Sequence, residues 1–473
     1  MTTAIMLFRR DLRLRDNPAL CAACETHSRI LPVYIHADHE EAPWQPGGAS
    51  KWWLHHSLQA LQQQLRERGG SLHLYKGDTL HVLRDIIQRS GAEAVYWNRL
   101  YEPAVMARDT RIKQVLREQG VAVHSHASAL WHEPWQVKTR QGEPYRVFTP
   151  YWRSLRPNLS VTPPLSEPAG VTWKALPPSL PWEALALLPR IRWDKGLGET
   201  WRPGVQGAWD GVELFCDDAL ADYATGRDLP ARHGTSRLSP YLHFGEISPR
   251  QVLHALHQHT QRIDLRRRPD LEPFLRELAW REFAHHLLYH FPQTPTENFN
   301  ARFADFPWAP DDELQLQRWQ QGRTGIPLVD AGMRELWHTG WMHNRVRMVV
   351  ASLLTKNLRQ HWLHGARWFW DTLVDADLAN NTLGWQWVAG CGADAAPYFR
   401  VFNPVSQARK FDPAGVYLRR WLPELEDVSI DLLHEPWIDP SMVKRTGYPL
   451  PMLDLGASRQ QALGAYASWR RLG

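Results

Sequence analysis

The stretch Ala4-Ile-Met-Leu-Phe8 decides the fold, because it is the first of several short apolar runs that alternate with helical stretches. The other runs are Ile30-Leu-Pro-Val-Tyr-Ile35, Ser71-Leu-His-Leu-Tyr75 and Ala94-Val-Tyr-Trp97. Helical periodicity lies between them over 52–68, and again over 105–119. Strands that alternate with helices predict βαβ units and a parallel sheet. We therefore expect an α/β, Rossmann-like domain over 1–130.

Proline sets the next part of the chain apart. Nine prolines fall between residues 157 and 203. Proline disrupts helix interiors and central strands, so we expect a long connector over 131–208. From 209 to 473 the pattern is mostly helical, with three- and four-residue apolar spacing over 271–291, 328–338 and 341–362. We expect this second domain to be all-α.

Composition excludes several classes of protein. Hydrophobic residues make up 43% and charged residues 22% of the 473 residues, as in ordinary globular proteins. No apolar stretch approaches the ~18 residues that span a bilayer, and the start is not a secretory signal, so no membrane partner is expected. Four cysteines are too few for a disulfide framework, which favours a cytoplasmic location.

Charge and tryptophan content point to partners without choosing among them. The net charge of +5 permits an acidic partner such as DNA. Tryptophan occurs 25 times, an excess that suggests stacking on aromatic ligands or bases, sugar binding, or a redox role. The pair Cys21-x-x-Cys24 lacks a second pair at zinc spacing, so no metal site is predicted.

The stretch Gly234-Thr-Ser-Arg-Leu-Ser-Pro240 is a first candidate site. Serine and threonine at a helix entry cap the helix, and the free N–H groups there attract phosphate. Arg237 would add a fixed positive charge. Tyr223 and Arg227 lie just upstream and could join the same pocket. The alternative is a simple helix cap.

A second candidate lies in Glu277-Leu-Ala-Trp-Arg-Glu-Phe283. On a helix, Glu277 and Trp280 share one face, and Arg281 follows Glu277 at i+4. A carboxylate and a tryptophan that point together into a cavity could bind a polar aromatic ligand. The alternative is a Glu277–Arg281 surface pair beside a core tryptophan.

The third candidate is Gly340-Trp-Met-His-Asn-Arg-Val-Arg-Met348. Helical spacing places polar side chains on one face among apolar neighbours, where burial without partners is costly. The expected partners are Asp375 and Asp377, which leaves open whether the pairing is structural or functional. These two carboxylates also allow a hypothesis of a tryptophan-rich carbohydrate enzyme with an acid/base pair, although their spacing does not define one.

Five motifs occur together in this order. They are Phe8-Arg-Arg-Asp-Leu-Arg-Leu-Arg-Asp-Asn-Pro-Ala-Leu20, Thr235-Ser-Arg-Leu-Ser239, Trp341-Met-His-Asn-Arg345, Asp375-x-Asp377-x3-Asn381-x3-Trp385-Gln-Trp387, and Pro397-Tyr-Phe-Arg-Val-Phe-Asn-Pro404. Through them the sequence resembles the photolyase/cryptochrome family along nearly its whole length, and most closely the bacterial cyclobutane-pyrimidine-dimer photolyases.

The resemblance implies FAD bound in the helical domain. The residues implied to hold it are Tyr223, Thr235, Ser236, Arg237, Leu238, Ser239, Arg281, Asn344, Arg347, Asp375, Asp377 and Asn381. Asn381 would face the flavin N5, where an amide can change its hydrogen-bonding role. Asparagine there is typical of photolyases. Phe274 stands where many relatives carry tryptophan.

The resemblance also implies damaged DNA as the partner. The residues implied to contact it are Arg227, Glu277, Trp280, Asn344, Arg345, Met348, Trp387 and Arg400. The implied reaction is electron transfer, driven by blue or near-UV light, from reduced FADH⁻ into a pyrimidine dimer taken out of the base stack, after which the cyclobutane ring splits and the electron returns. The residues implied to act in it are Glu277, Asn381, and a tryptophan chain of Trp385, Trp362 and Trp308.

The antenna and the biological role leave alternatives. Folate-binding relatives continue Tyr-Glu with an Asn-Glu pair, whereas this chain reads Tyr101-Glu102-Pro103-Ala104. A folate (methenyltetrahydrofolate) or a deazaflavin antenna are both open, as are another flavin or no antenna. A cryptochrome-type receptor without repair activity is the alternative function, although the residues implied to contact DNA favour repair. The resemblance implies a monomer.

Overall fold

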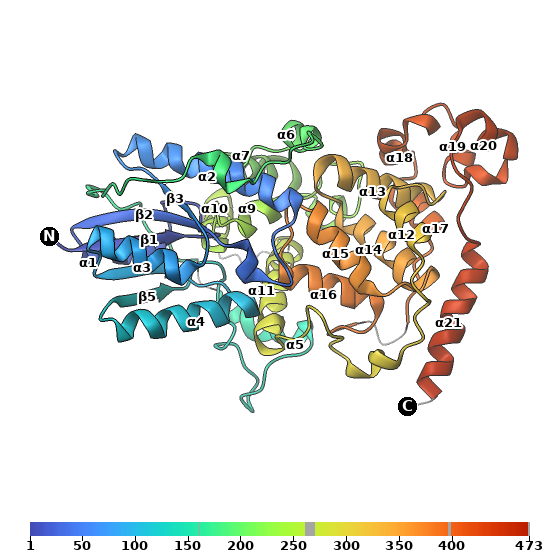
Figure 1. Cartoon of the computed structure of the whole chain (residues 1–473). Helices are drawn as coiled ribbons and strands as arrows, with labels where there is room; N and C mark the ends of the chain where they lie inside the picture. The colour runs from blue at the N-terminus through green and yellow to red at the C-terminus, as the bar shows by residue number, and fades with distance from the viewer. Residues whose placement is uncertain (160, 261–269, 396–398, 472–473) are drawn as a thin grey trace.

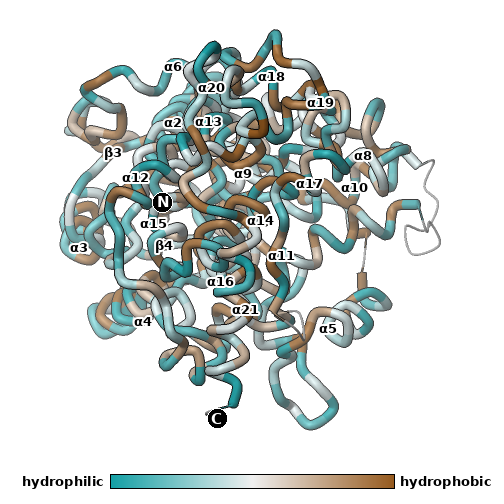
Figure 2. The backbone as a smooth tube through the Cα atoms, turned by 90° about the vertical axis from the view of Figure 1, so that its right-hand side faces the viewer, coloured by the Kyte–Doolittle hydropathy of each residue, from teal (hydrophilic) through white to brown (hydrophobic). Residues whose placement is uncertain are grey.

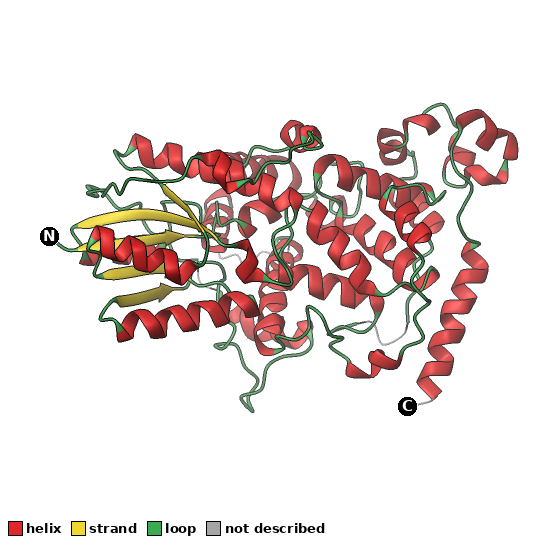
Figure 3. Cartoon of the chain, viewed as in Figure 1, coloured by secondary structure: helices red, strands yellow, loops and turns green. Residues whose placement is uncertain are grey.

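The computed structural model describes residues 1–473 except 160, 261–269, 396–398 and 472–473. A single sheet occupies the N-terminal end, and helices make up the C-terminal end (Figure 1, Figure 3). Its strands are β1 (Thr3–Phe8), β2 (Arg29–His36), β3 (His73–Lys76), β4 (Ala94–Asn98) and β5 (Ala122–His126). They pair in the order β3-β2-β1-β4-β5, and every pair is parallel. The predicted fold class, a parallel sheet followed by a helical part, is confirmed.

The two faces of the sheet pack into different cores. Because successive side chains of a strand point to opposite faces, Met6 of β1 joins one core while Leu7 joins the other. Helices cover both faces: α1 (Pro18–Thr26), α2 (Gly48–Glu67), α3 (Thr79–Ser90) and α4 (Pro103–Glu118). The core that holds Met6 also includes Phe274 and Phe283 of the helical part. This core therefore joins the sheet to α11 (Glu272–His290), which carries Glu277 and Trp280, while the helices within 344–389 pack in a separate core.

The helical part contains helices at two of the stretches that the apolar spacing predicts, since 271–291 corresponds to α11 and 328–338 to α13 (Pro327–Thr339). Its helices are α7 (Val205–Leu214), α8 (Tyr223–Gly226), α9 (Ser239–His243), α10 (Pro249–His259), α11 (Glu272–His290), α12 (Glu313–Gln320), α13 (Pro327–Thr339), α14 (Asn344–Ser352), α15 (Trp362–Thr372), α16 (Leu378–Ala389), α17 (Pro404–Phe411), α18 (Val416–Trp421), α19 (Ile430–Leu433), α20 (Pro440–Thr446) and α21 (Leu455–Arg471). Seen from the helical end, apolar and polar residues alternate along most helices (Figure 2), the pattern of helices that cover a core. In the described part of the chain, no helix is long and apolar enough to cross a membrane.

The prediction of one helix over 341–362 is wrong. The chain forms α14, passes through a π-helical turn at Leu353–Asn357, and starts α15 only at Trp362. Arg359 adopts a left-handed φ of 54°, and the His361 side chain caps α15 by accepting the Leu363 N–H. Apolar spacing continues across this break because both helices face the same core.

The edge strand β5 was not predicted. In its sequence, Ala122-Val-His-Ser-His126, only Val123 is buried, so it carries no apolar run. It pairs with β4 alone, at the edge of the sheet. Such a short and polar strand is found from its partner rather than from its own composition.

The proline-rich segment packs along the sheet. The Leu180 N–H donates to the Leu74 carbonyl at 2.9 Å, and Trp173 forms a bridge with Ile30. Two helices lie in the predicted connector, α5 (Phe148–Leu155) and α6 (Lys195–Thr200). The predicted domain boundaries at 130 and 208 stay predictions.

A glycine sets the contact between α15 and α16. A Cβ atom added to Gly365 would lie 2.0 Å from the ring of Trp385. The indole of Trp385 therefore rests directly on the backbone of α15. This contact fixes how α16, which carries Asn381 and Trp387, sits in the helical part.

Candidate active site

An ion pair at the start of α14 organises the site. Arg347 Nη2 lies 2.9 Å from Oδ2 of Asp375, whose side chain is 5% exposed. The hydroxyl of Ser239, the first residue of α9, donates to the same oxygen at 2.7 Å. The pairing of Arg347 with Asp375 expected from the sequence is confirmed. Asn344 is the first residue of α14, three positions before Arg347, and is exposed.

Arg237 lies between two tryptophans. Its Cζ is 4.3 Å from the ring centre of Trp201 and 4.9 Å from that of Trp341. Its Nε is buried and has no hydrogen-bond partner among the described residues. Burial lowers the pKa of Arg237, which means that the guanidinium lacks full compensation. An acidic group of a ligand would supply that partner, so the segment that ends at Ser239 fits the phosphates of a dinucleotide.

The rest of the predicted phosphate segment is set by close packing. A Cβ atom on Gly234 would lie 2.3 Å from the carbonyl oxygen of Gly226, so α8 and this segment meet backbone to backbone. Thr235 and Ser236 are half-buried. Leu238 is 2% exposed and belongs to the core, so only its backbone can face a ligand.

Tyr223 is also buried in the core. Its ring packs edge-on against Phe215 and Phe274, with centroids 5.5 Å and 5.3 Å away. Phe274 therefore supplies packing at the place where the sequence departs from many relatives. The expected phosphate contact of Tyr223 is limited to the rim of a ring that is 6% exposed.

Asp377 turns its carboxylate toward two histidines. Its Oδ2 lies 3.5 Å from His243 Nδ1 and 3.4 Å from His285 Nε2. Although burial opposes it, these imidazoles hold the pKa of Asp377 well below its usual value. Burial likewise opposes the rise in the pKa of His285, which Asp377 produces. Sequence reasoning missed both histidines, since only the fold brings them to Asp377.

The other carboxylate oxygen of Asp377 caps the N-terminus of α16. Asp377 Oδ1 accepts the Asn380 N–H at 2.9 Å, as an N-cap residue does. The amide of Asn381 donates to the Ala366 carbonyl of α15 at 3.0 Å. The Asn381 side-chain oxygen, which accepts no bond in this pairing, is the group left for a ligand.

Helix α11 presents Glu277 and Trp280 as predicted, but with other partners. Glu277 Oε1 lies 2.6 Å from Arg227 Nη1. Arg281 instead donates to the carbonyls of Ala129 and Leu242 at 2.7 Å and 3.4 Å. The alternative interpretation of a Glu277–Arg281 surface pair is therefore wrong, because Arg281 ties α11 to the N-terminal part.

The other residues implied to contact DNA come from α14, α16 and the segment before α17. Trp387 is half-buried, and its indole N–H donates to the Asp394 carbonyl at 3.1 Å. Met348 packs half-buried against the same core, and Arg400 is exposed with Cζ 4.5 Å from the Phe402 ring centre. Arg345 pairs with Asp228 at 2.5 Å. Arg345, like Arg227, thus already holds a carboxylate.

Two tryptophans of the implied chain lie on helices, Trp362 at the start of α15 and Trp385 on α16, and Trp308 lies in the loop before α12. Trp385 is 3% exposed and packs edge-on against Phe369. Trp362 is fully buried, and its indole N–H donates to Asn298 at 2.9 Å. Trp308 is half-buried, 5.1 Å from the ring of His361, which in turn lies 5.7 Å from Trp362. Burial thus decreases from Trp385 and Trp362 to Trp308.

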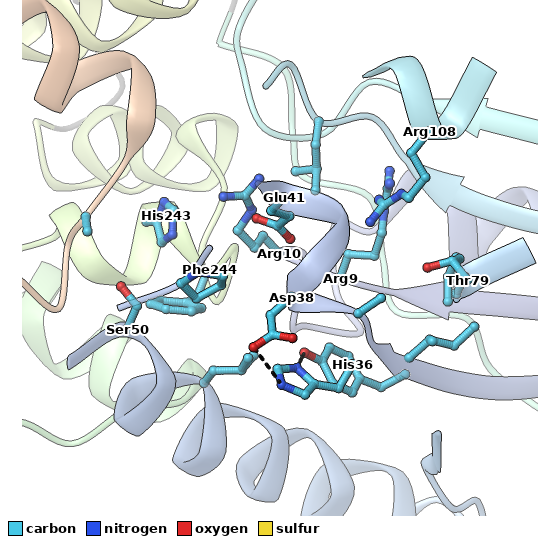
Figure 4. A pocket seen from close by; sticks show the side chains of 18 of the residues that line it. Arg9, Arg10, His36, Asp38, Glu41, Ser50, Thr79, Arg108, His243 and Phe244 are labelled. Atoms are coloured by element: carbon cyan, nitrogen blue, oxygen red, sulfur yellow. Dashed lines mark hydrogen bonds and ion pairs between the residues drawn. The ribbon is translucent and has the colours of Figure 1, made fainter. Parts of the chain in front are cut away.

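A separate cavity of about 70 Å³ lies at the carboxyl ends of β1 and β2, where ligands of open parallel sheets bind (Figure 4). Figure 4 shows the side chains of Arg9, Arg10 and Arg108 around it, with His36 facing Asp38. Arg10 pairs with Glu102 at 2.6 Å, and Arg108 pairs with Glu40 at 3.4 Å. The cations around this cavity are therefore paired inside the protein.

Glu335 of α13 should make the free energy of unfolding depend on pH. Its Oε2 accepts the Tyr417 hydroxyl at 2.7 Å and the His343 N–H at 3.3 Å, and burial raises the pKa of Glu335 to about 7 from 4.5. The folded protein thus binds this proton more tightly than the unfolded chain does. The contribution of Glu335 to the free energy of unfolding is therefore fully present below pH ~4.5. It is lost as the pH rises toward ~7.

Glu335→Gln removes that titration while keeping a hydrogen-bond acceptor. Relative to the variant, the wild type should lose about 3 kcal/mol of unfolding free energy as the pH rises from about 5 to 8. Denaturant unfolding of both proteins across this range measures the difference. Parallel profiles would show that Glu335 does not titrate in this window.

The comparisons with known proteins cover both ends of the chain. Residues 4–169 match the family model of DNA photolyase, and residues 274–468 match the model of the FAD binding domain of DNA photolyase. The chain is 47% identical to the deoxyribodipyrimidine photo-lyase of Agrobacterium fabrum, over 99% of this chain and 98% of that relative. It is also 38% identical to cryptochrome-2 of Arabidopsis thaliana, over 96% of this chain and 77% of that relative.

A solved structure matches the chain over its whole length. The crystal structure of a bacterial class III photolyase from Agrobacterium tumefaciens superposes with a TM-score of 0.94, at 46% identity, over 100% of this chain and 98% of that one. Identity at this level over the whole length, with the same fold, shows common descent. The chain therefore belongs to the photolyase/cryptochrome family.

Proposed function

We propose that the protein is a deoxyribodipyrimidine photolyase that uses blue or near-UV light to split cyclobutane pyrimidine dimers in DNA. The observation that carries the proposal is the placement of Glu277, Trp280 and Trp387. All three stay partly exposed on the packed helices α11 and α16, whereas Trp362 and Trp385 are buried. Partly exposed indoles are available to a ligand, and a flipped base needs flat walls that replace its lost stacking.

The helical part fits FAD, which when bound in its reduced form would absorb the light and supply the transferred electron. The orphan Nε of Arg237 suits a phosphate, whereas the Ser239 hydroxyl already donates to Asp375 and would reach a phosphate only by leaving that carboxylate. Arg347, held against Asp375, would supply a fixed cation to the flavin rings. Asn381 offers its amide oxygen. The roles of these residues rest on the family resemblance and on this donor set.

The substrate would compete with carboxylates for two arginines. Arg227 is paired with Glu277, and Arg345 is paired with Asp228. Exchange of either partly exposed carboxylate for a phosphate costs little at a surface. Glu277 would then be free to donate to, or accept from, the damaged bases. The exposed Arg400 needs no such exchange.

The test compares light with darkness. Purified protein, chemically reduced, is mixed with an oligonucleotide that contains one pyrimidine dimer. Repair should occur under blue or near-UV light and not in the dark. Equal product in both conditions would contradict the proposal. Light-induced flavin reduction without any repair would favour the cryptochrome-type receptor, which the Arabidopsis relative keeps open.

Trp362 offers a test of the implied tryptophan chain. Trp362→Phe should slow light-induced reduction of bound oxidised flavin roughly tenfold or more, because phenylalanine keeps the ring but is far harder to oxidise. Bleaching of the oxidised flavin band under illumination measures this rate. Trp97→Phe, at a buried position in β4, is the control for general packing and should leave the rate unchanged. Equal rates in both variants would exclude Trp362 from the route.

We propose that a second chromophore, if bound, occupies the cavity at the carboxyl ends of β1 and β2, where ligands of open parallel sheets bind. Arg10 and Arg108 line it and are paired with Glu102 and Glu40, so an anionic chromophore would compete with these carboxylates. Acid release of the chromophore and its fluorescence spectrum distinguish a folate from a deazaflavin. A chromophore that binds elsewhere on the protein would contradict the proposal.

A further inference from the structure

Asp394 connects the two tryptophans that the proposed function places around the substrate. It contacts Trp387 directly and is linked to Trp280 through Phe148. Its carbonyl accepts the indole N–H of Trp387 at 3.1 Å. Its carboxylate interacts with the backbone N–H of Phe148, at the start of α5. Asp394 is half-buried and has a left-handed φ of 53°. A residue 246 positions away in sequence thus meets the segment after α16.

Phe148 in turn holds Trp280. The two rings are stacked with centroids 3.8 Å apart and an interplanar angle of 7°. Phe148 is 1% exposed, whereas Trp280 is half-buried. Arg276 lies over Phe148, with Cζ 5.1 Å from its centre, and its charge also acts on Asp394. One face of the Trp280 indole is therefore covered by Phe148.

We propose that Asp394 and Phe148 are positioning residues that hold Trp280 and Trp387 at a fixed separation. The site would then accept two pyrimidines joined in a dimer and reject normal bases. The inference rests on the proposed function and deepens it. Neither residue needs to touch the substrate. Phe148 sets the plane of Trp280 by stacking, and Asp394 fixes Trp387 and Phe148 to each other.

The physical reason is orientation. A half-exposed indole without a covered face samples several rotamers, and ordering it on binding would cost free energy. Stacked aromatic pairs prefer one geometry, and a hydrogen-bonded indole N–H has a fixed direction. Both constraints act before the ligand arrives. Losing the stack, or the carboxylate by which Asp394 ties Phe148 to the carbonyl that holds Trp387, should weaken binding of damaged DNA more than binding of normal DNA, which depends mainly on phosphate contacts.

Two pairs of variants separate position from general packing. Asp394→Gly keeps the left-handed backbone and its carbonyl but removes the carboxylate, whereas Asp394→Asn tolerates the same φ and keeps an acceptor oxygen. Phe148→Leu keeps apolar volume but loses the stack, whereas Phe148→Tyr keeps the ring. In each pair the second variant is the conservative rescue.

The measurement is the ratio of two dissociation constants, determined in the dark for the flavin-containing full chain. One is for an oligonucleotide with a pyrimidine dimer, and the other is for the same sequence undamaged. Asp394→Gly and Phe148→Leu should lower this preference roughly tenfold, while Asp394→Asn and Phe148→Tyr stay within about twofold of the wild type. Flavin content should be the same in all four variants.

Several outcomes would overturn the proposal. It fails if Asp394→Gly and Phe148→Leu keep the wild-type preference, or if all four variants lose it together with flavin. If the wild type itself does not prefer damaged DNA, the proposed function fails and so does the substrate role inferred here. The near-UV circular dichroism of the stacked rings then reports separately whether Phe148→Leu alone releases Trp280.

Discussion

Glu277→Ala is expected to lower the yield of light-dependent dimer repair by roughly ten- to one-hundredfold while flavin content stays unchanged. The reason is that a hydrogen bond to a charged group contributes about 1.5–3 kcal/mol, and each 1.36 kcal/mol is a factor of ten. Glu277 is partly exposed, with its side chain 33% accessible, so its removal should not unfold α11. The measurement is repaired oligonucleotide per absorbed photon, together with the flavin-to-protein absorbance ratio.

Two matched variants separate the carboxyl group from its ion pair. Arg227→Ala removes the partner but keeps Glu277, so repair of bound dimer should persist while DNA binding weakens. Glu277→Gln keeps a donor and an acceptor and should retain more repair than Glu277→Ala. Unchanged repair in Glu277→Ala would mean that this carboxyl group takes no part in the reaction.

Asp375→Ala should be the most damaging change for FAD retention. It leaves Arg347 without its partner and removes the acceptor of the Ser239 hydroxyl. Asp375 is 5% exposed but Arg347 is 25% exposed, so losing this partly buried pair should cost about 1.5–3 kcal/mol, roughly ten- to a hundredfold in affinity. The fraction of protein that keeps flavin through gel filtration measures the loss.

The ion pair of Arg334 with Glu424 is the control. It lies in the same helical part at 2.7 Å, but both side chains are about one quarter exposed. Glu424→Ala should therefore change stability by about 1 kcal/mol or less and leave FAD retention intact. Full flavin content in Asp375→Ala, or equal losses in both variants, would show that Asp375 has no special role in holding the cofactor.

The fold follows from patterns that the sequence displays locally. Apolar runs such as Ala4–Phe8 mark strands that are covered on both faces, and three of the four predicted runs agree closely with β1, β2 and β4. The break between α14 and α15 was not predictable, because both helices pack on one core and the apolar spacing runs through it. β5 was missed for the opposite reason, since an edge strand with one buried residue has no pattern of its own.

The site was predictable where a charge must be buried. Arg347 stands among apolar residues, so a nearby acid was required, and Asp375 supplies it. The partners of Asp377 and Glu277 could not be found in this way. His285 lies 92 residues from Asp377 and Arg227 lies 50 residues from Glu277, so only tertiary packing brings each pair together. The same holds for Phe148, which nothing in the local pattern connects to Trp280.

The contact of Trp385 with the backbone of α15 also constrains how this protein can change. A methyl group at position 365 would collide with the indole, and a smaller ring at position 385 would leave a void between the helices. Neither position can be altered alone without displacing the other. Related chains should therefore vary the two positions jointly. Where a bulkier residue replaces Gly365, we expect a smaller side chain in place of Trp385.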